Sequence, residues 1–111
     1  MLQEKSIIFA TRIINLYKFL CDNKKEYIIA KQIFRSGTSI GANIAESRYA
    51  ESRNDFLHKL SISLKEANET HYWLILLEKG EYIDNTQFSS LENDIKELIK
   101  MLISATKKLK N

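Results

Sequence analysis

A stretch of small residues between two long amphipathic segments constrains the fold of this chain most. Residues 35–46 read Arg-Ser-Gly-Thr-Ser-Ile-Gly-Ala-Asn-Ile-Ala-Glu and hold two of the three glycines. In a helix, Gly37 and Gly41 would lie on one side, where the missing side chains let another backbone approach closely. A glycine costs about 1 kcal/mol relative to alanine inside a helix, so two in one turn indicate close packing, a kink or a site. The alternative is a turn at residues 36–39 that splits the segment into a helix-turn-helix.

Two faces of this segment follow from helical spacing. The glycine side is shared by Ile33, Ile40, Ile44 and Arg48. An adjacent polar stripe holds Arg35, Ser39, Asn43 and Glu46.

The rest of the chain is typical of an all-helical protein. Proline is absent, and apolar residues recur at helical spacing. A first helix is predicted over residues 3–20, with a broad apolar face. A second should run from about Lys25 to Tyr49 if it crosses the glycine stretch. The apolar face of the first helix comprises Ile7, Phe9, Ala10, Ile13, Ile14, Leu16, Tyr17 and Leu20.

Capping signals delimit two further helices. Ser52 and Asp55 fit a capping box, and the third helix should end at Gly80, whose backbone has free access to positive φ. Its core seam is predicted to be Leu57, Leu60, Leu64, Ala67, His71 and Leu74. A second capping box, at residues 84–87, begins a helix with an unbroken three-four apolar repeat from Phe88 to Leu109. Four such helices with short connections predict one all-α domain over residues 1–111, an up-down-up-down four-helix bundle.

Cysteine content and hydropathy bear on the compartment. The single cysteine, Cys21, cannot form an internal disulfide and is expected to be a small core or boundary residue. No segment is apolar enough to span a membrane, and polar residues interrupt residues 7–20, so they do not resemble a signal peptide. We expect a cytoplasmic protein without a membrane partner.

The net charge of the chain at pH 7 is +3, and the basic residues are unevenly distributed along the sequence. Residues 1–35 carry seven basic and three acidic side chains, and three lysines lie near the C-terminus. This suits an anionic partner such as nucleic acid, and the alternative is a solvated lysine-rich surface. The candidate nucleic-acid-binding residues are Lys18, Lys24, Lys25, Lys31, Arg35, Arg48, Arg53, Lys107 and Lys108.

Enzyme and metal signatures are missing from the sequence. The spacing of Gly37 and Gly41 matches neither the Walker phosphate-binding loop nor the glycine-rich dinucleotide-binding motif. The sequence also has no cluster of cysteine and histidine suited to zinc. A carboxylate-bridged metal bundle needs two Glu-x-x-His motifs. Here the residue three positions after Glu66 is Glu69, and the residue three positions after Glu69 is Tyr72, so neither motif is present. We therefore expect no catalytic residues, no metal and no cofactor. Glu46, Glu66 and Glu69 are expected to balance Arg35, Arg48 or Lys59, and His71 to be a hydrogen-bonded structural residue.

Residues 72–77, Tyr-Trp-Leu-Ile-Leu-Leu, are apolar on every side of the third helix. A helix at the edge of a small bundle should keep a polar face, so something further must cover this segment. Two interpretations stay open. Trp73 with Leu76 or Leu77 lies in a subunit interface, or a thick core absorbs all of them.

Residues 35–46, 56–61 and 64–74 together resemble the 23S rRNA intervening-sequence protein family of bacterial four-helix bundles. That family is similar to the accessory variability proteins of diversity-generating retroelements, which form basic pentameric barrels and work with a reverse transcriptase on nucleic acid. The resemblance implies a continuous second helix and a ring-like homopentamer of side-by-side bundles. It implies no enzymatic activity. It suggests mainly structural roles for Gly37, Gly41, Asn43, Glu46, Glu66, Glu69 and Trp73. His71 and Tyr72 are structural or interface candidates from their positions in the third helix.

Two functional hypotheses follow. The first is a non-catalytic oligomeric bundle that binds RNA or DNA through phosphate contacts, as an accessory protein associated with rRNA or a reverse transcriptase. The alternative is a scaffold that docks a partner enzyme and does not itself bind nucleic acid.

Overall fold

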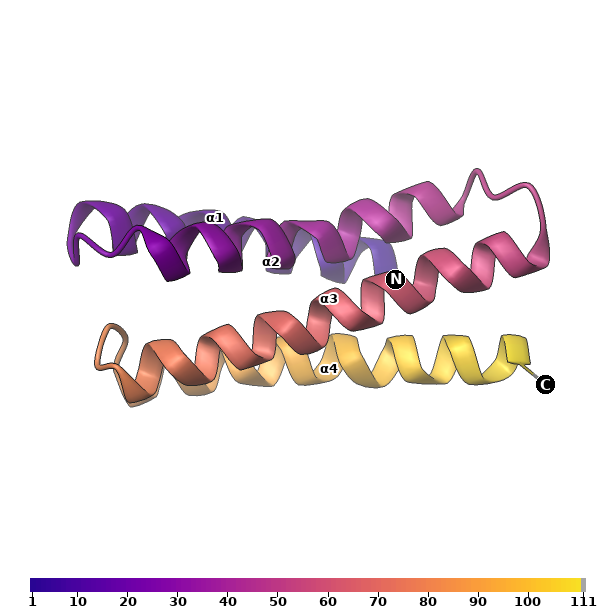
Figure 1. The fold of residues 1–111 in the computed structure, drawn as a ribbon. Coiled ribbons are helices and arrows are strands. Elements are labelled where there is room, and N and C mark those ends of the chain that lie inside the picture. Colours follow the sequence, from indigo (N-terminus) through magenta and orange to yellow (C-terminus); the bar gives the residue numbers. More distant parts are fainter. Residues whose placement is uncertain (111) are drawn as a thin grey trace.

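Four antiparallel helices form the molecule, as predicted. The computed structural model describes residues 1–110, with side chains as far as Lys108. The helices are α1 (Leu2–Asp22), α2 (Ile28–Ser47), α3 (Arg53–Lys79) and α4 (Asn85–Lys110), and the described residues contain no strand. They run alternately up and down in an elongated body of 44 × 20 × 20 Å (Figure 1). The sequence-based prediction of an all-α up-down-up-down bundle is confirmed.

Each helix packs on its neighbour in sequence, and α1 closes the bundle against α4. The α1–α4 contact is the thinnest of the four. Ion pairs bridge it between Lys5 and Glu97 and between Arg12 and Asp94, with a small hollow beside Phe9. The N-terminus and the last turn of α4 lie toward the end of the bundle at which α2 connects to α3 (Figure 1).

The glycine stretch is helical throughout, so the alternative of a turn at residues 36–39 is wrong. Gly37 faces Ile13 of α1, and a Cβ at position 37 would lie 2.8 Å from Ile13 Cγ1. Gly41 faces Ser6, whose Oγ would lie 2.9 Å from a Cβ at position 41. The two glycines therefore let the backbone of α2 approach α1, and this packing explains why the helix tolerates their low propensity.

Helix α2 is shorter than predicted at both ends. Lys25 has φ 56°, a left-handed conformation that a right-handed helix cannot include, so α2 begins only at Ile28. The Glu26 carboxylate accepts a hydrogen bond from the Ala30 amide at 2.9 Å and caps the first turn. At the other end Arg48 is the C-cap residue and is exposed, so it does not share the buried glycine side as predicted.

Most of the capping contacts predicted for α3 and α4 are present in the structure. Asp84 and Gln87 form both bonds of the predicted capping box, at 2.7 and 2.9 Å. Ser52 accepts from the Asp55 amide at 3.0 Å, whereas the Asp55 carboxylate accepts from the amide of Glu51 rather than that of Ser52. After α3 the left-handed residue is Glu81, with φ 66°, while the expected Gly80 stays right-handed.

The core holds most of the predicted apolar residues but divides the apolar face of α1. Phe9, Ile13, Leu16 and Leu20 are buried, whereas Ile7 and Ile14 remain 57% and 37% exposed. Leu74 and Leu77 of α3 are fully buried, so Leu77 cannot form a subunit interface. The α4 repeat contributes Leu91, Ile95, Leu98 and Leu102; the side chain of Leu109 lies outside the described part.

Candidate functional site

The segment at residues 35–46 contacts α3 through small polar side chains. Thr70 Oγ1 lies 2.8 Å from Ser36 Oγ, and both side chains are completely buried. Ser63 Oγ donates to the Ile40 carbonyl at 2.8 Å, also in the interior. Short hydroxyl side chains let α2 and α3 pack closely and satisfy one another, because a buried polar group without a partner is costly. This segment thus joins α1 on one side and α3 on another.

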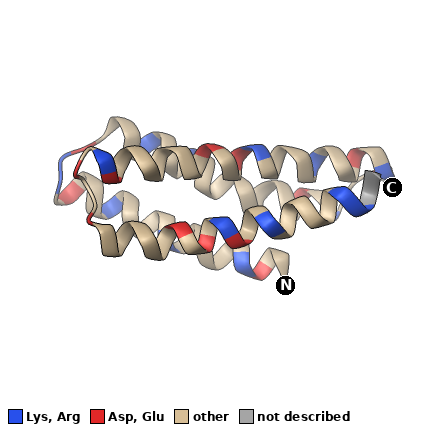
Figure 2. Cartoon of the chain, turned by 90° about the horizontal axis from the view of Figure 1, so that it is seen from below, with Lys and Arg blue, Asp and Glu red and all other residues tan. Residues whose placement is uncertain are grey.

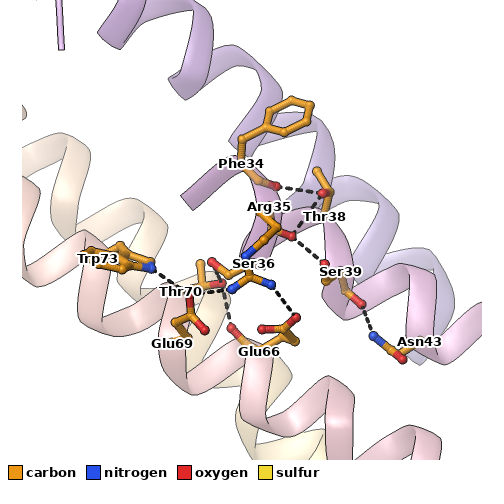
Figure 3. Close-up of polar contacts among 10 residues, drawn as sticks. All are labelled: Phe34, Arg35, Ser36, Thr38, Ser39, Asn43, Glu66, Glu69, Thr70 and Trp73. Atoms are coloured by element: carbon orange, nitrogen blue, oxygen red, sulfur yellow. Dashed lines mark hydrogen bonds and ion pairs between the residues drawn. The ribbon is translucent and has the colours of Figure 1, made fainter. Parts of the chain in front are cut away.

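An ion-pair network lies at the outer edge of the same contact. Figure 3 shows Arg35 reaching from α2 between two carboxylates of α3, with Nη1 at 2.8 Å from Glu66 Oε2 and Nη2 at 2.5 Å from Glu69 Oε2. Trp73 Nε1 donates to the same Glu69 oxygen at 3.0 Å. The sequence-based expectation that Glu66 and Glu69 balance Arg35 is confirmed by these ion pairs, which tie α2 to α3. Arg35 is also a candidate nucleic-acid-binding residue, and half of its side chain remains exposed.

The pKa values of the paired groups are shifted in the directions that these contacts require. The pKa of the Glu69 carboxyl is lowered, first by the hydrogen bond from Trp73 and then, against the opposing effect of burial, by Arg35. The pKa of Arg35 is raised, chiefly by its hydrogen bonds to Glu66 and Glu69. On α4 the pKa of Glu92 is lowered, first by the hydrogen bond from His71, whose Nε2 lies 2.8 Å from Glu92 Oε2. His71 therefore contacts α4, as part of the α3–α4 packing.

The other predicted structural residues make local contacts. Glu46 pairs with Lys59 at 3.4 Å, and Asn43 donates to the Ser39 carbonyl at 2.8 Å. Tyr72 is exposed and packs edge-on against Trp73, with ring centroids 5.1 Å apart. Trp73 itself is half-buried against the core.

The cationic candidates divide between the two ends of the bundle. Lys18, Lys24, Lys25 and Lys31 lie where α1 connects to α2. Arg48, Arg53, Lys107 and Lys108 lie at the opposite end, where α2 connects to α3 and α4 finishes. Between the ends, basic and acidic segments alternate along the helices in the view of Figure 2. The structure therefore brings the candidates together as two separate groups.

The two ends differ in acidic content. At the α1–α2 end, residues 18–31 and 78–87 carry five basic and five acidic side chains. An open hollow there is lined by Lys24 together with Glu78, Glu81 and Asp84. At the α2–α3 end, residues 1–4, 46–59 and 100–108 carry six basic and four acidic side chains. Within the described residues, Arg48, Lys107 and Lys108 are exposed and form no ion pair with a carboxylate.

Two features of the surface were not predicted from the sequence. Tyr49, between Arg48 and Ala50 in the α2–α3 turn, is 85% exposed. An uncharged strip also follows the outer side of α1 and α2, where the rings of Tyr17 and Phe34 meet with centroids 4.9 Å apart. The sequence feature that could have revealed this strip is the breadth of the apolar face of α1, which was predicted to be buried as a whole. This strip, the α1–α2 face, comprises Ile7, Ala10, Ile14, Tyr17, Phe34, Thr38, Ala42 and Ala45.

The described residues include no group of three or more His, Cys, Asp or Glu side chains placed to hold a metal ion. Within the same residues, no helix combines the length and apolarity needed to cross a membrane.

The fold and surface together define a small all-α bundle with a polar α2–α3 contact and an excess of basic side chains at its α2–α3 end. The model of the 23S rRNA-intervening sequence protein family matches residues 2–104, and the chain belongs to this family. It is also similar to a solved protein of unknown function from the S23 ribosomal protein family of Bacteroides thetaiotaomicron VPI-5482. The two are 57% identical with a TM-score of 0.96, covering 96% of this chain and 99% of the other. No match was found among curated proteins.

Proposed function

We propose that this protein is a non-catalytic, oligomeric helical bundle that binds RNA or DNA through phosphate contacts, with little sequence specificity, in the bacterial cytoplasm. The observation that carries the proposal is the α2–α3 end, where Arg48, Lys107 and Lys108 are exposed without a carboxylate partner among the described residues. Cations without partners are available to neutralise phosphates, which supply most non-specific affinity. The family is named for 23S rRNA, which supports an accessory role beside rRNA. A role beside a reverse transcriptase is proposed from the sequence resemblance alone.

The proposed assembly uses the α1–α2 face. None of its residues is charged, and Ile7 and Ile14 would gain apolar burial from a second copy of the chain. Side-by-side protomers in the same orientation would place their more basic α2–α3 ends on one shared rim and so multiply a modest local charge. A ring of such protomers, a pentamer by resemblance, is the arrangement we propose.

The test is binding of a short fluorescent RNA, measured by anisotropy at several salt concentrations. Affinity should fall linearly with salt on logarithmic axes, because each phosphate contact releases counterions. Lys107→Gln with Lys108→Gln should weaken binding to all sequences alike. On a single strand, the slope should also become shallower by about 0.7 for each phosphate that the variant no longer neutralises.

The matched control, Lys24→Gln with Lys25→Gln, removes the same charge from the opposite end of the bundle. Acidic side chains are as numerous as basic ones there, so this control should weaken binding less. An equal or larger effect of the control would move the proposed binding surface to the α1–α2 end.

The alternative function, a scaffold for a partner enzyme, is favoured by the length of the uncharged α1–α2 face. A partner would then cover this face, and the partner would hold any nucleic acid. Capture of a reverse transcriptase that survives nuclease treatment, with no RNA binding by the purified protein at low salt, would favour the scaffold over the first proposal.

A further inference from the structure

We propose that Tyr49 stacks on an unpaired base and makes the α2–α3 end selective for single-stranded over double-stranded nucleic acid. This inference rests on the proposed nucleic-acid binding and deepens it by naming the class of ligand.

Tyr49 differs in setting from the other tyrosines. Its side chain is 85% exposed, whereas Tyr17 packs on Phe34 and Tyr72 packs on Trp73. Tyr82 packs against the core. Tyr27 is 50% exposed but lies at the α1–α2 end, where acidic side chains are as numerous as basic ones. Tyr49 therefore combines the greatest ring exposure with the more basic end of the bundle.

The backbone holds Tyr49 in place. Its amide donates to the Glu46 carbonyl at 3.0 Å, and the amides on either side donate to the carbonyls of Ala45 and Ser47 at 3.3 and 3.2 Å. Shortly after this turn, Ser52 caps α3. Because the backbone of the turn is already ordered, stacking has to fix only the two side-chain torsions of Tyr49, so less of the stacking free energy is lost to ordering.

Stacking accounts for strand selectivity. Every base has an aromatic face, so the contact tolerates any sequence, but in a duplex neighbouring bases cover those faces. Exposed cations at the same end, Arg48, Lys107 and Lys108, would contact phosphates of either ligand. Stacking is worth about five- to 150-fold in affinity per base, so it can separate single strands from duplexes when phosphate contacts cannot.

The experiment compares an unstructured single-stranded RNA with a duplex of the same length and sequence, by fluorescence anisotropy at low salt. Tyr49→Ala should weaken single-strand binding by about fivefold or more and leave duplex binding unchanged. Tyr49→Phe keeps the ring and should bind as the natural protein does. Tyr27→Ala, the matched control at the opposite end, should change neither affinity.

The possible results separate the two proposals. If the natural protein binds neither RNA, the proposed function and this inference both fail. If it binds both and Tyr49→Ala binds like the natural protein, only the stacking inference fails. Equal weakening of single-strand and duplex binding in Tyr49→Ala would also overturn it, because the residue would then only shape the turn.

Discussion

At the scale of single residues, Gly37 has no room for one additional carbon. A Cβ would lie 2.8 Å from Ile13 Cγ1 and 3.0 Å from Ile13 Cγ2, and Ile13 is fully buried and β-branched, so it cannot rotate away. Alanine gains about 1 kcal/mol of helix propensity, but overpacking typically costs about 1–3 kcal/mol. We expect Gly37→Ala to lower the free energy of unfolding by up to about 2 kcal/mol, measured by urea denaturation.

A second background tests the cause of this destabilisation. In Ile13→Ala the two nearest carbons are gone, so adding Gly37→Ala should cost nothing or stabilise the helix. An equal cost in both backgrounds would show that the contact with Ile13 is not responsible.

The hydrogen bond from Trp73 is the main cause of the lowered pKa of Glu69. The indole N–H stabilises the carboxylate, so Trp73→Phe should move that pKa back up toward the usual 4.5. A lowered native pKa adds stability above the unfolded-state pKa and loses it as pH falls through the native one. The contribution of Glu69 to stability should therefore be smaller in the Trp73→Phe variant, and its loss on acidification should be complete at a higher pH.

Carboxyl NMR titration of Glu69 checks this directly. Tyr72→Phe, which leaves the indole in place, serves as the control and should leave the pKa of Glu69 unchanged. A pKa that stays equally low in Trp73→Phe would assign the shift to Arg35 instead.

At the scale of the helices, the α2–α3 contact depends on a buried hydroxyl pair. Thr70→Val keeps the shape of the side chain but leaves the Ser36 hydroxyl without this partner in a fully buried position. We expect stability to fall by about 1–3 kcal/mol, the usual cost of an unsatisfied buried group. Adding Ser36→Ala removes the second hydroxyl and should recover part of that stability in urea denaturation.

Exposed ion pairs provide the comparison. Arg12→Ala breaks the contact with Asp94 across the α1–α4 seam, where both side chains are over a third exposed. Such surface pairs contribute about 0–1 kcal/mol, so this variant should cost less than Thr70→Val. A larger cost for Arg12→Ala would contradict the inference that the buried hydroxyl pair contributes more to stability than the exposed ion pair.

The elements themselves could be predicted because the relevant signals are local. Apolar spacing, the Asp84–Gln87 capping box and the absence of proline are read along the chain and indicate four helices in their order. The start of α2 could not be predicted, because it depends on Lys25 taking a left-handed conformation that a glycine or asparagine normally signals. Likewise the left-handed turn after α3 lies at Glu81 rather than at the glycine before it.

Surface assignments were harder to predict for a physical reason. The sequence did predict that Glu66 and Glu69 would balance the charge of Arg35, and the ion pairs confirm it. Ile7 and Ile14 have the spacing of a core, yet α1 turns only half of its apolar face toward the bundle. Which half of the face is buried depends on how far α1 rotates about its axis, and periodicity does not fix that rotation.

At the scale of the whole molecule, the α1–α2 face should govern assembly. Ile14→Lys places a charge within the uncharged strip, and burying it between protomers would be costly. We expect this variant to keep its helical content and to shift toward the monomer in size-exclusion chromatography with light scattering. Ile103→Lys, the same change at a 48% exposed site on α4, should assemble as the natural protein does. Unchanged assembly of Ile14→Lys would place the interface elsewhere.

The order of helix pairs along the chain also has a kinetic consequence. Three of the four helix pairs join helices adjacent in sequence, and the α1–α4 seam is the pair that joins the first helix to the last, for example through Arg12 and Asp94. Chains dominated by such local contacts cross a low entropic barrier and fold quickly. With no proline in the sequence, slow prolyl isomerisation is also absent. The helical hairpins should therefore form first, and docking of α1 onto α4 should complete the native state.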